Sequence, residues 1–513
     1  MTGSRLPFRE LFATLAADAA RRLSAETGLS SEALASAQQD LLRLLTGLAG
    51  WPLTAAFRVY PARPGSSERE AHREFISRML NGGLDRFFAE FPVLSRLVTA
   101  CIDDWLAGGR EFALRLRKDR RALVRTFGDG AAADVVDLDV AMSDRHGGRS
   151  VIGVTFASGL KLIYKPRDMA LERAWFDLLD WINAHGAPAD QRVVKILEKA
   201  GYGWEEFVPA NPCRSRAGAC NFFIRAGALQ CLVYVLNGTD MHMGNLIACG
   251  SWPVLVDAEC LLQPLRRAEA DRDYDEATLE DLLQTGLLPR PRVLAIDPFD
   301  LSGLAGHGGQ PTDYRVPVWG PVWSNDSLGF SEGVLLPQKN LPVQNGVPLE
   351  LRVHRDEFLQ GFEEMHAYLQ DRRRELLARG GPLRQMFACP SRVLLHTTRY
   401  YMALMSRSLR PRFLRDDALR SALLREALAD QQPAIERPIV EAEAAAIENL
   451  NIPYFKAPGG RSLATNSRLL FHPYFDAGGP EVARARLATL SERTREHDLS
   501  VLRILFAMSS LPV

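Results

Sequence analysis

Residues 237–259 read NGTDMHMGNLIACGSWPVLVDAE, and this stretch decides which fold we expect the chain to adopt. It places Asp240 and Asn245 five positions apart in a polar loop, followed by two short apolar runs that predict strands. Asp257 stands directly after the second run. Oxygen ligands at a strand end and in a neighbouring loop are typical of a Mg²⁺ site.

Toward the N-terminus, short β-branched runs alternate with Gly-containing turns, and the first three runs are expected to pair antiparallel. The predicted elements are strands over 135–140, 151–156, 160–164, 192–197 and 202–208, and helices over 171–182 and 220–236. Together with the stretch above, they follow the order in which a kinase-like fold assembles its nucleotide site.

Both flanks of this core are predicted to be helical. A chain of 513 residues is too long for one ordinary core, so several regions are expected. We predict an α+β chain with a helical N-terminal region over 1–125, a kinase-like N-lobe over 126–210 and a C-lobe over 211–513. The C-lobe would include a long activation-type segment at 297–350, rich in Gly, Pro and Asn, and a C-terminal helical extension.

Composition narrows the class of protein. Sixty-two basic and 62 acidic residues leave no net charge, so nucleic-acid binding through a basic surface is not expected. The N-terminus has no apolar run long enough for a signal peptide or a membrane span. Seven cysteines without close spacing predict free thiols. A cytoplasmic enzyme is therefore expected.

Lys165 ends the third predicted strand, where its ammonium can reach the phosphates of ATP. Lys161 lies on the same face by the strand period of two and is its rival. In protein kinases the lysine pairs with a glutamate. Glu172 or Glu206 could supply that partner, and the sequence does not choose between them.

The loop acids have distinct expected roles. In a kinase-like site Asp240 would accept the proton of the substrate hydroxyl, while Asn245 and Asp257 would bind Mg²⁺. Glu259 either adds a carboxylate to the metal site or is an exposed acid on the next turn. The competing interpretation is a purely structural Asp–Asn turn around a buried, hydrogen-bonded His242.

Nine segments give the chain a resemblance to one family over roughly residues 90 to 475. They are 91–94 (FPVL), 162–167 (LIYKPR), 202–207 (YGWEEF), Asp240-x-His242-x-x-Asn245, Asp257-x-Glu259, 285–289 (TGLLP), 300–304 (DLSGL), Gly361-Phe362 and 451–455 (NIPYF). In combination they are specific. The chain resembles the N-terminal dehydratase domain of LanM-type (class II) lanthipeptide synthetases.

That resemblance implies an elaborated lipid-kinase-like, bilobal fold. It also implies an enzyme that binds a precursor peptide through a leader segment and phosphorylates its Ser and Thr with ATP and Mg²⁺. Elimination of the phosphate would then give dehydroalanine and dehydrobutyrine. Lys165 would be the ATP lysine. The phosphotransfer and metal set would be Asp240, His242, Asn245, Asp257 and Glu259.

The chain departs from the family pattern at three places. No Cys-His-Gly zinc segment precedes its end at Val513, so a stand-alone dehydratase with a separate cyclase is expected. Gly244 replaces the acidic residue before the loop Asn. The family's Arg-x-x-x-Arg-x-Thr-x-x-Tyr segment begins here at Arg392 and has His396 in place of its second Arg.

The last departure concerns elimination, which needs a cation at the leaving phosphate and a base at the Cα proton. Arg392 is expected to hold that phosphate, with Arg399 nearby in sequence and Ser302 at a position where the family has a polar residue. Two alternatives remain open. One is a kinase of peptides or small molecules that does not eliminate, and the other is a non-catalytic peptide-binding protein.

Overall fold

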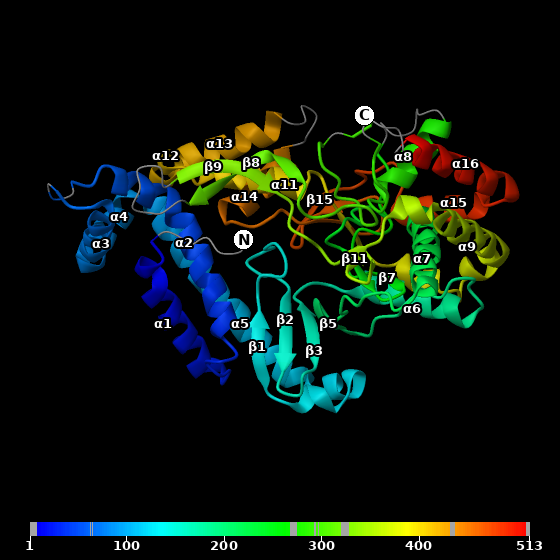
Figure 1. Cartoon of the computed structure of the whole chain (residues 1–513), viewed down its shortest axis with the longest axis horizontal. Helices are drawn as coiled ribbons and strands as arrows, with labels where there is room; N and C mark the ends of the chain where they lie inside the picture. The colour runs from blue at the N-terminus through cyan, green and yellow to red at the C-terminus, as the bar shows by residue number, and fades with distance from the viewer. Residues whose placement is uncertain are drawn as a thin grey trace.

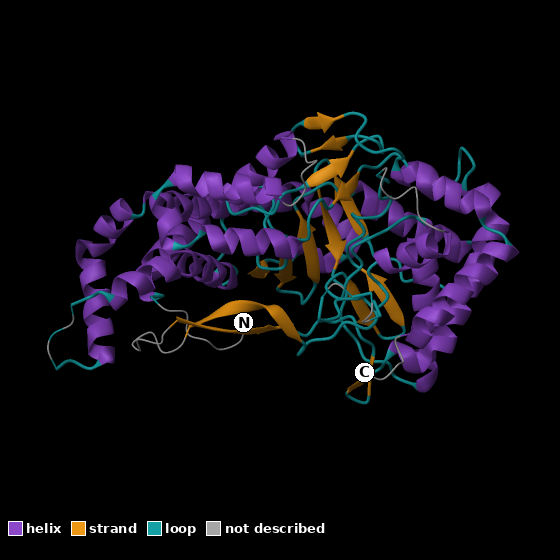
Figure 2. Cartoon of the chain, turned by 90° about the horizontal axis from the view of Figure 1, so that it is seen from above, coloured by secondary structure: helices purple, strands orange, loops and turns teal. Residues whose placement is uncertain are grey.

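The computed structural model describes residues 8–508 apart from 62, 64, 267–273, 292–293, 296, 320–327 and 431–436. Helices and strands are mixed, with much of the strand content lying between two groups of helices (Figure 2). The first group is N-terminal, as expected. It comprises α1 (Glu10–Thr27), α2 (Ala35–Arg58), α3 (Glu68–Arg78), α4 (Leu84–Glu90) and α5 (Pro92–Phe127).

Five strands form an antiparallel sheet in the order β1-β2-β3-β5-β4. The strands are β1 (Val135–Asp139), β2 (Ile152–Phe156), β3 (Lys161–Lys165), β4 (Ile196–Lys199) and β5 (Tyr202–Glu206), with α6 (Ala170–Ala184) between β3 and β4. The antiparallel pairing of the first three strands is therefore confirmed.

The fourth strand begins four residues later than predicted. The side chain of Asn183, in α6, bonds both backbone groups of Gln191, at 2.7 and 2.9 Å. The chain is thus held by the helix end at this point, and its backbone joins the sheet only farther on.

One face of the sheet packs against the N-terminal helices. The rings of Tyr164 and Trp204 lie 4.9 Å apart, and Phe112 of α5 lies 5.4 and 5.8 Å from them. The buried indole N–H of Trp204 donates to the carboxylate of Asp119, also in α5, at 3.0 Å. The helical region and the sheet therefore share one hydrophobic core. The opposite face carries Lys165.

A second core lies in the C-terminal part, around α7 (Arg216–Val235) and α9 (Arg355–Leu376), which α15 (Gly479–Thr489) and α16 (Glu492–Met508) adjoin (Figure 1). Glycines bring α7 and α9 into close contact. A Cβ at Gly227 would stand 1.9 Å from the carbonyl oxygen of Phe358, and one at Gly361 would stand 1.8 Å from that of Ile224. By length and composition α7 could cross a membrane, but 67% of its most apolar stretch is buried in this core.

The remaining elements complete the C-terminal part. They are β6 (Leu246–Cys249), β7 (Trp252–Leu255), α8 (Tyr274–Gln284), α10 (Leu383–Met386), β12 (Ser391–Val393), α11 (Thr398–Ser408), α12 (Pro411–Arg415), α13 (Asp417–Asp430), α14 (Arg437–Glu448), β13 (Phe455–Ala457), β14 (Leu463–Ala464) and β15 (Leu469–Phe471). β12 to β15 form a four-stranded sheet. α12 returns to pack on α2 and α5.

The segment 297–350 contains strands that its composition did not predict. β8 (Pro311–Trp319) pairs with β9 (Leu328–Val334), and β10 (Val343–Gln344) pairs with β11 (Val347–Pro348). Residues 320–327 of the predicted segment lie outside the described part. Asn345 and Gly346 join β10 to β11 with φ values of +52° and +80°. This Asn-Gly pair is the sequence signal of a tight hairpin.

Candidate active site

The predicted site loop connects α7 to β6 and is held in a defined shape. Asp240 has a φ of +69°, which is uncommon for a residue with a side chain. The Asn245 side-chain amide donates to the Asp240 carbonyl oxygen at 2.8 Å, and the Val256 N–H donates to the Asn245 carbonyl at 2.9 Å. The loop and the end of β7 are therefore positioned together, as the sequence predicted.

Two glycine-containing segments support this loop from outside. The N–H of Met241 donates to the carbonyl of Thr285 at 2.9 Å, and a Cβ at Gly286 would stand 2.9 Å from the Met241 nitrogen. A Cβ at Gly303 would meet the Met241 carbonyl oxygen at 2.5 Å, and Ser302 forms a β-bridge with His242. The TGLLP and DLSGL segments thus hold the loop through its backbone.

Lys165 is buried and faces the end of β7. Its ammonium lies 2.7 Å from the Glu205 carboxylate and donates to the Val256 carbonyl at 2.7 Å. Burial lowers the pKa of Lys165, but the carboxylates of Glu205 and Asp257 outweigh that effect and raise it above its usual value. Lys165 is therefore a cation. Lys161 instead is exposed, with its ammonium 5.6 Å from the centre of the Phe207 ring.

The predicted partners of Lys165 are wrong. Glu206 pairs with Arg192 at 2.9 Å, and Glu172 pairs with Arg167. The reason is strand alternation, since Lys165 lies opposite Gly203 in the sheet and Glu205 is two residues farther along the same face. Glu206 points to the other side.

Arg167 is a site residue that the sequence reasoning missed. Its guanidinium lies 3.0 Å from Asp257 and 3.1 Å from Glu259, in addition to its contact with Glu172. One sequence signal could have revealed it: Arg167 stands two residues after Lys165, in the Lys-Pro-Arg of the LIYKPR segment. Arg167 links the end of β3 to both acids that follow β7.

Glu259 is buried among cations and is not an exposed acid. Its carboxylate contacts Arg167 and Arg392 and accepts a bond from the Tyr454 hydroxyl at 3.2 Å. The guanidinium of Arg392 lies over the Tyr454 ring, 5.1 Å from its centre. In this arrangement Glu259 positions Arg392, whose backbone N–H also donates to the Glu259 carbonyl at 2.8 Å.

The two site aspartates differ in their tendency to ionise. Burial raises the pKa of Asp240, although the neighbouring His242 and Arg392 oppose that effect. Burial would also raise the pKa of Asp257, but Arg167, Lys165 and Arg392 reverse the effect and lower it. Asp257 therefore stays ionised over a wide pH range, whereas Asp240 is the more ready proton acceptor.

His242 is half-exposed, so the interpretation as a buried structural histidine is wrong. Its Nε2 lies 3.9 Å from the Asp240 carboxylate, while its Nδ1 accepts the Gly244 N–H at 3.0 Å. A Cβ at residue 244 would come within 2.9 Å of the imidazole. The glycine that replaces the family's acidic residue thus allows this ring orientation.

The donor chemistry suits a magnesium–nucleotide complex. The Asn245 amide nitrogen is engaged, so its oxygen is directed elsewhere, and no partner for that oxygen occurs among the described residues. With the ionised Asp257 it offers hard oxygen ligands of the kind that Mg²⁺ requires. Lys165 supplies a fixed cation beside them. The residues present therefore fit both groups.

The segment that begins at Arg392 divides between two places. Arg392 joins the site, whereas His396 packs beside α14, with its Nε2 3.8 Å from the Glu443 carboxylate. The Tyr401 hydroxyl donates to the same carboxylate at 2.5 Å. Burial lowers the pKa of His396, so it does not replace the cationic Arg of the family.

The other two residues considered for elimination have surroundings of their own. Arg399 pairs with Asp297, and its guanidinium lies 5.1 Å from the centre of the Phe299 ring. Ser302 is buried behind the loop, and its hydroxyl has no partner among the described residues. Ser302 is thus the nearer of the two to the loop, through its bridge to His242.

A model of the Domain of unknown function (DUF4135) matches residues 91–458. The chain belongs to this family. The chain is also 23% identical over 371 residues to the lacticin 481/lactococcin biosynthesis protein LcnDR2 of Lactococcus lactis subsp. lactis. That match takes in 68% of the chain but only 39% of the relative's length. The two matches confirm the predicted LanM-like character, and the DUF4135 region contains every site residue described above.

Proposed function

We propose that the chain takes part in lanthipeptide biosynthesis as a dehydratase of a ribosomally made precursor peptide. It would phosphorylate Ser and Thr with ATP and Mg²⁺ and then eliminate the phosphate. The observation that carries the proposal is the convergence of Lys165, Asp240, Asn245 and Asp257, which come from three places in the sequence, with Arg392 adjoining them. A kinase-like bilobal fold is part of the same proposal. The similarity to LcnDR2, a lacticin 481/lactococcin biosynthesis protein, supports the biosynthetic role.

In the phosphorylation step, Mg²⁺-bound ATP supplies the phosphoryl group with its charge partly neutralised. Asn245 and Asp257 would hold the metal, and Lys165 would hold the phosphates. Asp240 would accept the proton of the peptide hydroxyl, in keeping with its raised pKa.

In the elimination step, a base removes the Cα proton, the bond from Cβ to the phosphate oxygen breaks, and a Cα=Cβ double bond forms. Arg392 would bind the departing phosphate, because its guanidinium is already fixed by Glu259 and Tyr454. The chain would use one pocket for both steps.

A kinase that does not eliminate is the second candidate. His396 favours it, because burial leaves this residue neutral where the family has an Arg. A precursor peptide would then leave the enzyme phosphorylated.

Mass spectrometry of a candidate precursor peptide, such as a Ser/Thr-rich peptide encoded beside this chain, tests both candidates. The intact chain with ATP and Mg²⁺ should give loss of water, and Asp240→Asn should give neither product. Arg392→Ala should give phosphopeptide, whereas the matched variant Arg399→Ala should still dehydrate. Gain of phosphate by the intact chain would favour the kinase, and an unchanged peptide would refute the proposal.

A further inference from the structure

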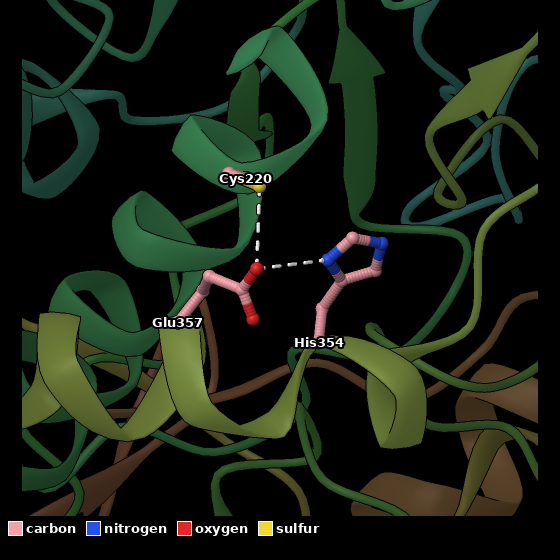
Figure 3. A group of neighbouring side chains, drawn as sticks. All are labelled: Cys220, His354 and Glu357. Carbon is pink, nitrogen blue, oxygen red and sulfur yellow. Dashed lines mark hydrogen bonds and ion pairs between the residues drawn. The ribbon is translucent and has the colours of Figure 1, made fainter. Parts of the chain in front are cut away.

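A thiol, an imidazole and a carboxylate meet between α7 and α9, far from the residues of the proposed function. Figure 3 shows the Glu357 carboxylate lying between the Cys220 sulfur and the His354 ring. The Cys220 Sγ and the His354 Nδ1 lie 3.2 and 3.4 Å from the same Glu357 oxygen. All three ligand atoms lie within 4.8 Å of one another.

The backbone fixes these three side chains before any ligand binds. Cys220 is in the second turn of α7, and His354 and Glu357 begin α9. The close contact of the two helices through their glycines, described above, sets the distance between these ends. The His354 ring also stacks on Phe223 of α7, with centroids 4.4 Å apart and planes 9° from parallel. Such preorganisation is what a small-ion site requires.

The geometry suits a tetrahedral ion. Bond lengths of about 2.3 Å to sulfur and about 2.0 Å to nitrogen and oxygen place tetrahedral ligand atoms roughly 3.3–3.7 Å apart. The two separations from the Glu357 oxygen need to change little to meet that requirement, while the Cys220 Sγ and the His354 Nδ1, within 4.8 Å of each other, would move closer together on binding. All three residues are only half-buried, which leaves room for a water molecule as a fourth ligand.

We propose that Cys220, His354 and Glu357 bind a zinc ion. A thiolate and an imidazole select zinc over the magnesium and calcium ions that prefer oxygen ligands alone. The Glu357 carboxylate would balance part of the positive charge of the zinc ion. The sequence does not predict this site by a close pair of ligands. Cys220 comes from a different helix and lies 134 residues before His354.

The role of the ion is structural. About fifteen helical residues separate Cys220 from the C-terminal end of α7, which corresponds to about 22 Å. The ion is therefore too distant to contact a substrate at Asp240. It would instead join the beginnings of α7 and α9, and α7 leads into the site loop.

Metal binding would displace the thiol proton. Zinc would bind the thiolate, and its affinity should therefore fall as the pH is lowered.

Cobalt titration of the full chain, after dialysis against a chelator, tests the site. The expected result is saturable thiolate-to-cobalt charge-transfer absorption that zinc removes. Cys220→Ser should lose the band and bind zinc at least about 100-fold more weakly, since even outer-shell partners are worth 10–100-fold. The matched control Cys389→Ser, at another half-buried thiol, should keep the band.

Two outcomes would overturn the proposal: no charge-transfer band in the intact chain, or an equal band in Cys220→Ser. Serine still offers a hydroxyl to Glu357, so this variant should fold, and its thermal unfolding without metal checks that it does. Glu357→Gln provides a second test. This variant should keep the thiolate-to-cobalt absorption band but bind cobalt more weakly. None of these measurements depends on phosphorylation, so failure here leaves the proposed function untouched.

Discussion

Glu205 and Glu206 are adjacent on β5, and the alternation of side chains along a strand gives them different surroundings. Glu205 is 2% exposed and pairs with Lys165, whereas Glu206 is partly exposed and pairs with Arg192. A partly exposed ion pair contributes little to stability, while loss of one partner from a buried pair leaves an uncompensated charge.

Under the proposed function, Glu205→Gln should therefore slow peptide phosphorylation at limiting ATP by at least about tenfold, since loss of one partner of a buried charge pair costs about 2–5 kcal/mol or more. Glu206→Gln changes the same chemical group one residue away and should stay within about twofold, because exposed pairs are worth about 0–1 kcal/mol. Steady-state rates of ADP release measure both. Equal activity of the two variants would contradict the assignment of Glu205.

Glu443 gives a pH-dependent prediction. This carboxyl group is fully buried in α14, and burial raises its pKa from 4.5 to about 7, although the Tyr401 hydroxyl bond opposes the shift. Between those two pH values the unfolded chain has lost this proton and the folded chain has kept it. Folding therefore becomes less favourable as the pH rises through this range.

Glu443→Gln should remove this pH-dependent contribution to the free energy of unfolding. It should be more stable than the intact chain above pH 7, by up to about 3 kcal/mol, and the difference should vanish near pH 4. Thermal unfolding of both proteins across pH 4–8 measures this. A difference that does not depend on pH would show that Glu443 does not carry the shift.

The site residues differ in how far the sequence could reveal them. Lys165, Asp240, Asn245 and Asp257 could be proposed from the sequence because each ends or closely follows a predicted strand, or lies in a loop, at a recognisable spacing. The pairing of Glu205 depends on the register between β3 and β5, which no local pattern records. Arg167 belongs to the LIYKPR segment, but its contact with Asp257, 90 positions away, cannot be read from that segment.

At the scale of elements, the contact between α7 and α9 depends on two glycines. Gly227→Ala should destabilise the chain by about 3 kcal/mol or more, because its Cβ would overlap the Phe358 carbonyl and a helix backbone cannot move aside easily. Gly47→Ala is the matched control. Gly47 is exposed within α2 with nothing near its Cβ, so that variant should gain up to about 1 kcal/mol.

Denaturant unfolding of the two alanine variants provides the measurement. A Gly227→Ala protein as stable as the intact chain would mean that the helices are not in such close contact. The sequence predicted a helix over 220–236 and helices in the C-terminal flank, where α7 and α9 lie. It did not predict their mutual contact, because a glycine at a crossing looks the same in sequence as a glycine in a turn.

At the scale of the whole molecule, the helical N-terminal region is bound to the rest on two sides. It shares a hydrophobic core with the five-stranded sheet, and the C-terminal helices return to it through the Arg96–Asp417 ion pair, 2.9 Å long, and the contacts of α12. The spacing of apolar residues predicted helices there but not this double attachment.

Removal of residues 1–90 should therefore prevent stable folding, because one side of α5 and the β1 edge of the sheet would lose their apolar cover. Circular dichroism melting and size-exclusion chromatography of the truncated chain test this expectation. A soluble, cooperatively melting product would instead identify the N-terminal helices as a separable unit, and its peptide affinity would then show whether they bind the leader.

Three bonds join the turn between β1 and β2 to residues 451–452. His146 Nδ1 lies 2.9 Å from the Ile452 carbonyl oxygen, the Gly148 N–H donates to the Asn451 side chain at 2.7 Å, and the Ile452 N–H donates to the Arg145 carbonyl at 2.8 Å. A rotation that moved the sheet away from residues 451–452 would break all three hydrogen bonds. Each broken bond would cost roughly 0.5–1.5 kcal/mol. Under the proposed function, nucleotide exchange that leaves these bonds intact would proceed by local movement of loops and side chains, with the five-stranded sheet staying attached to residues 451–452.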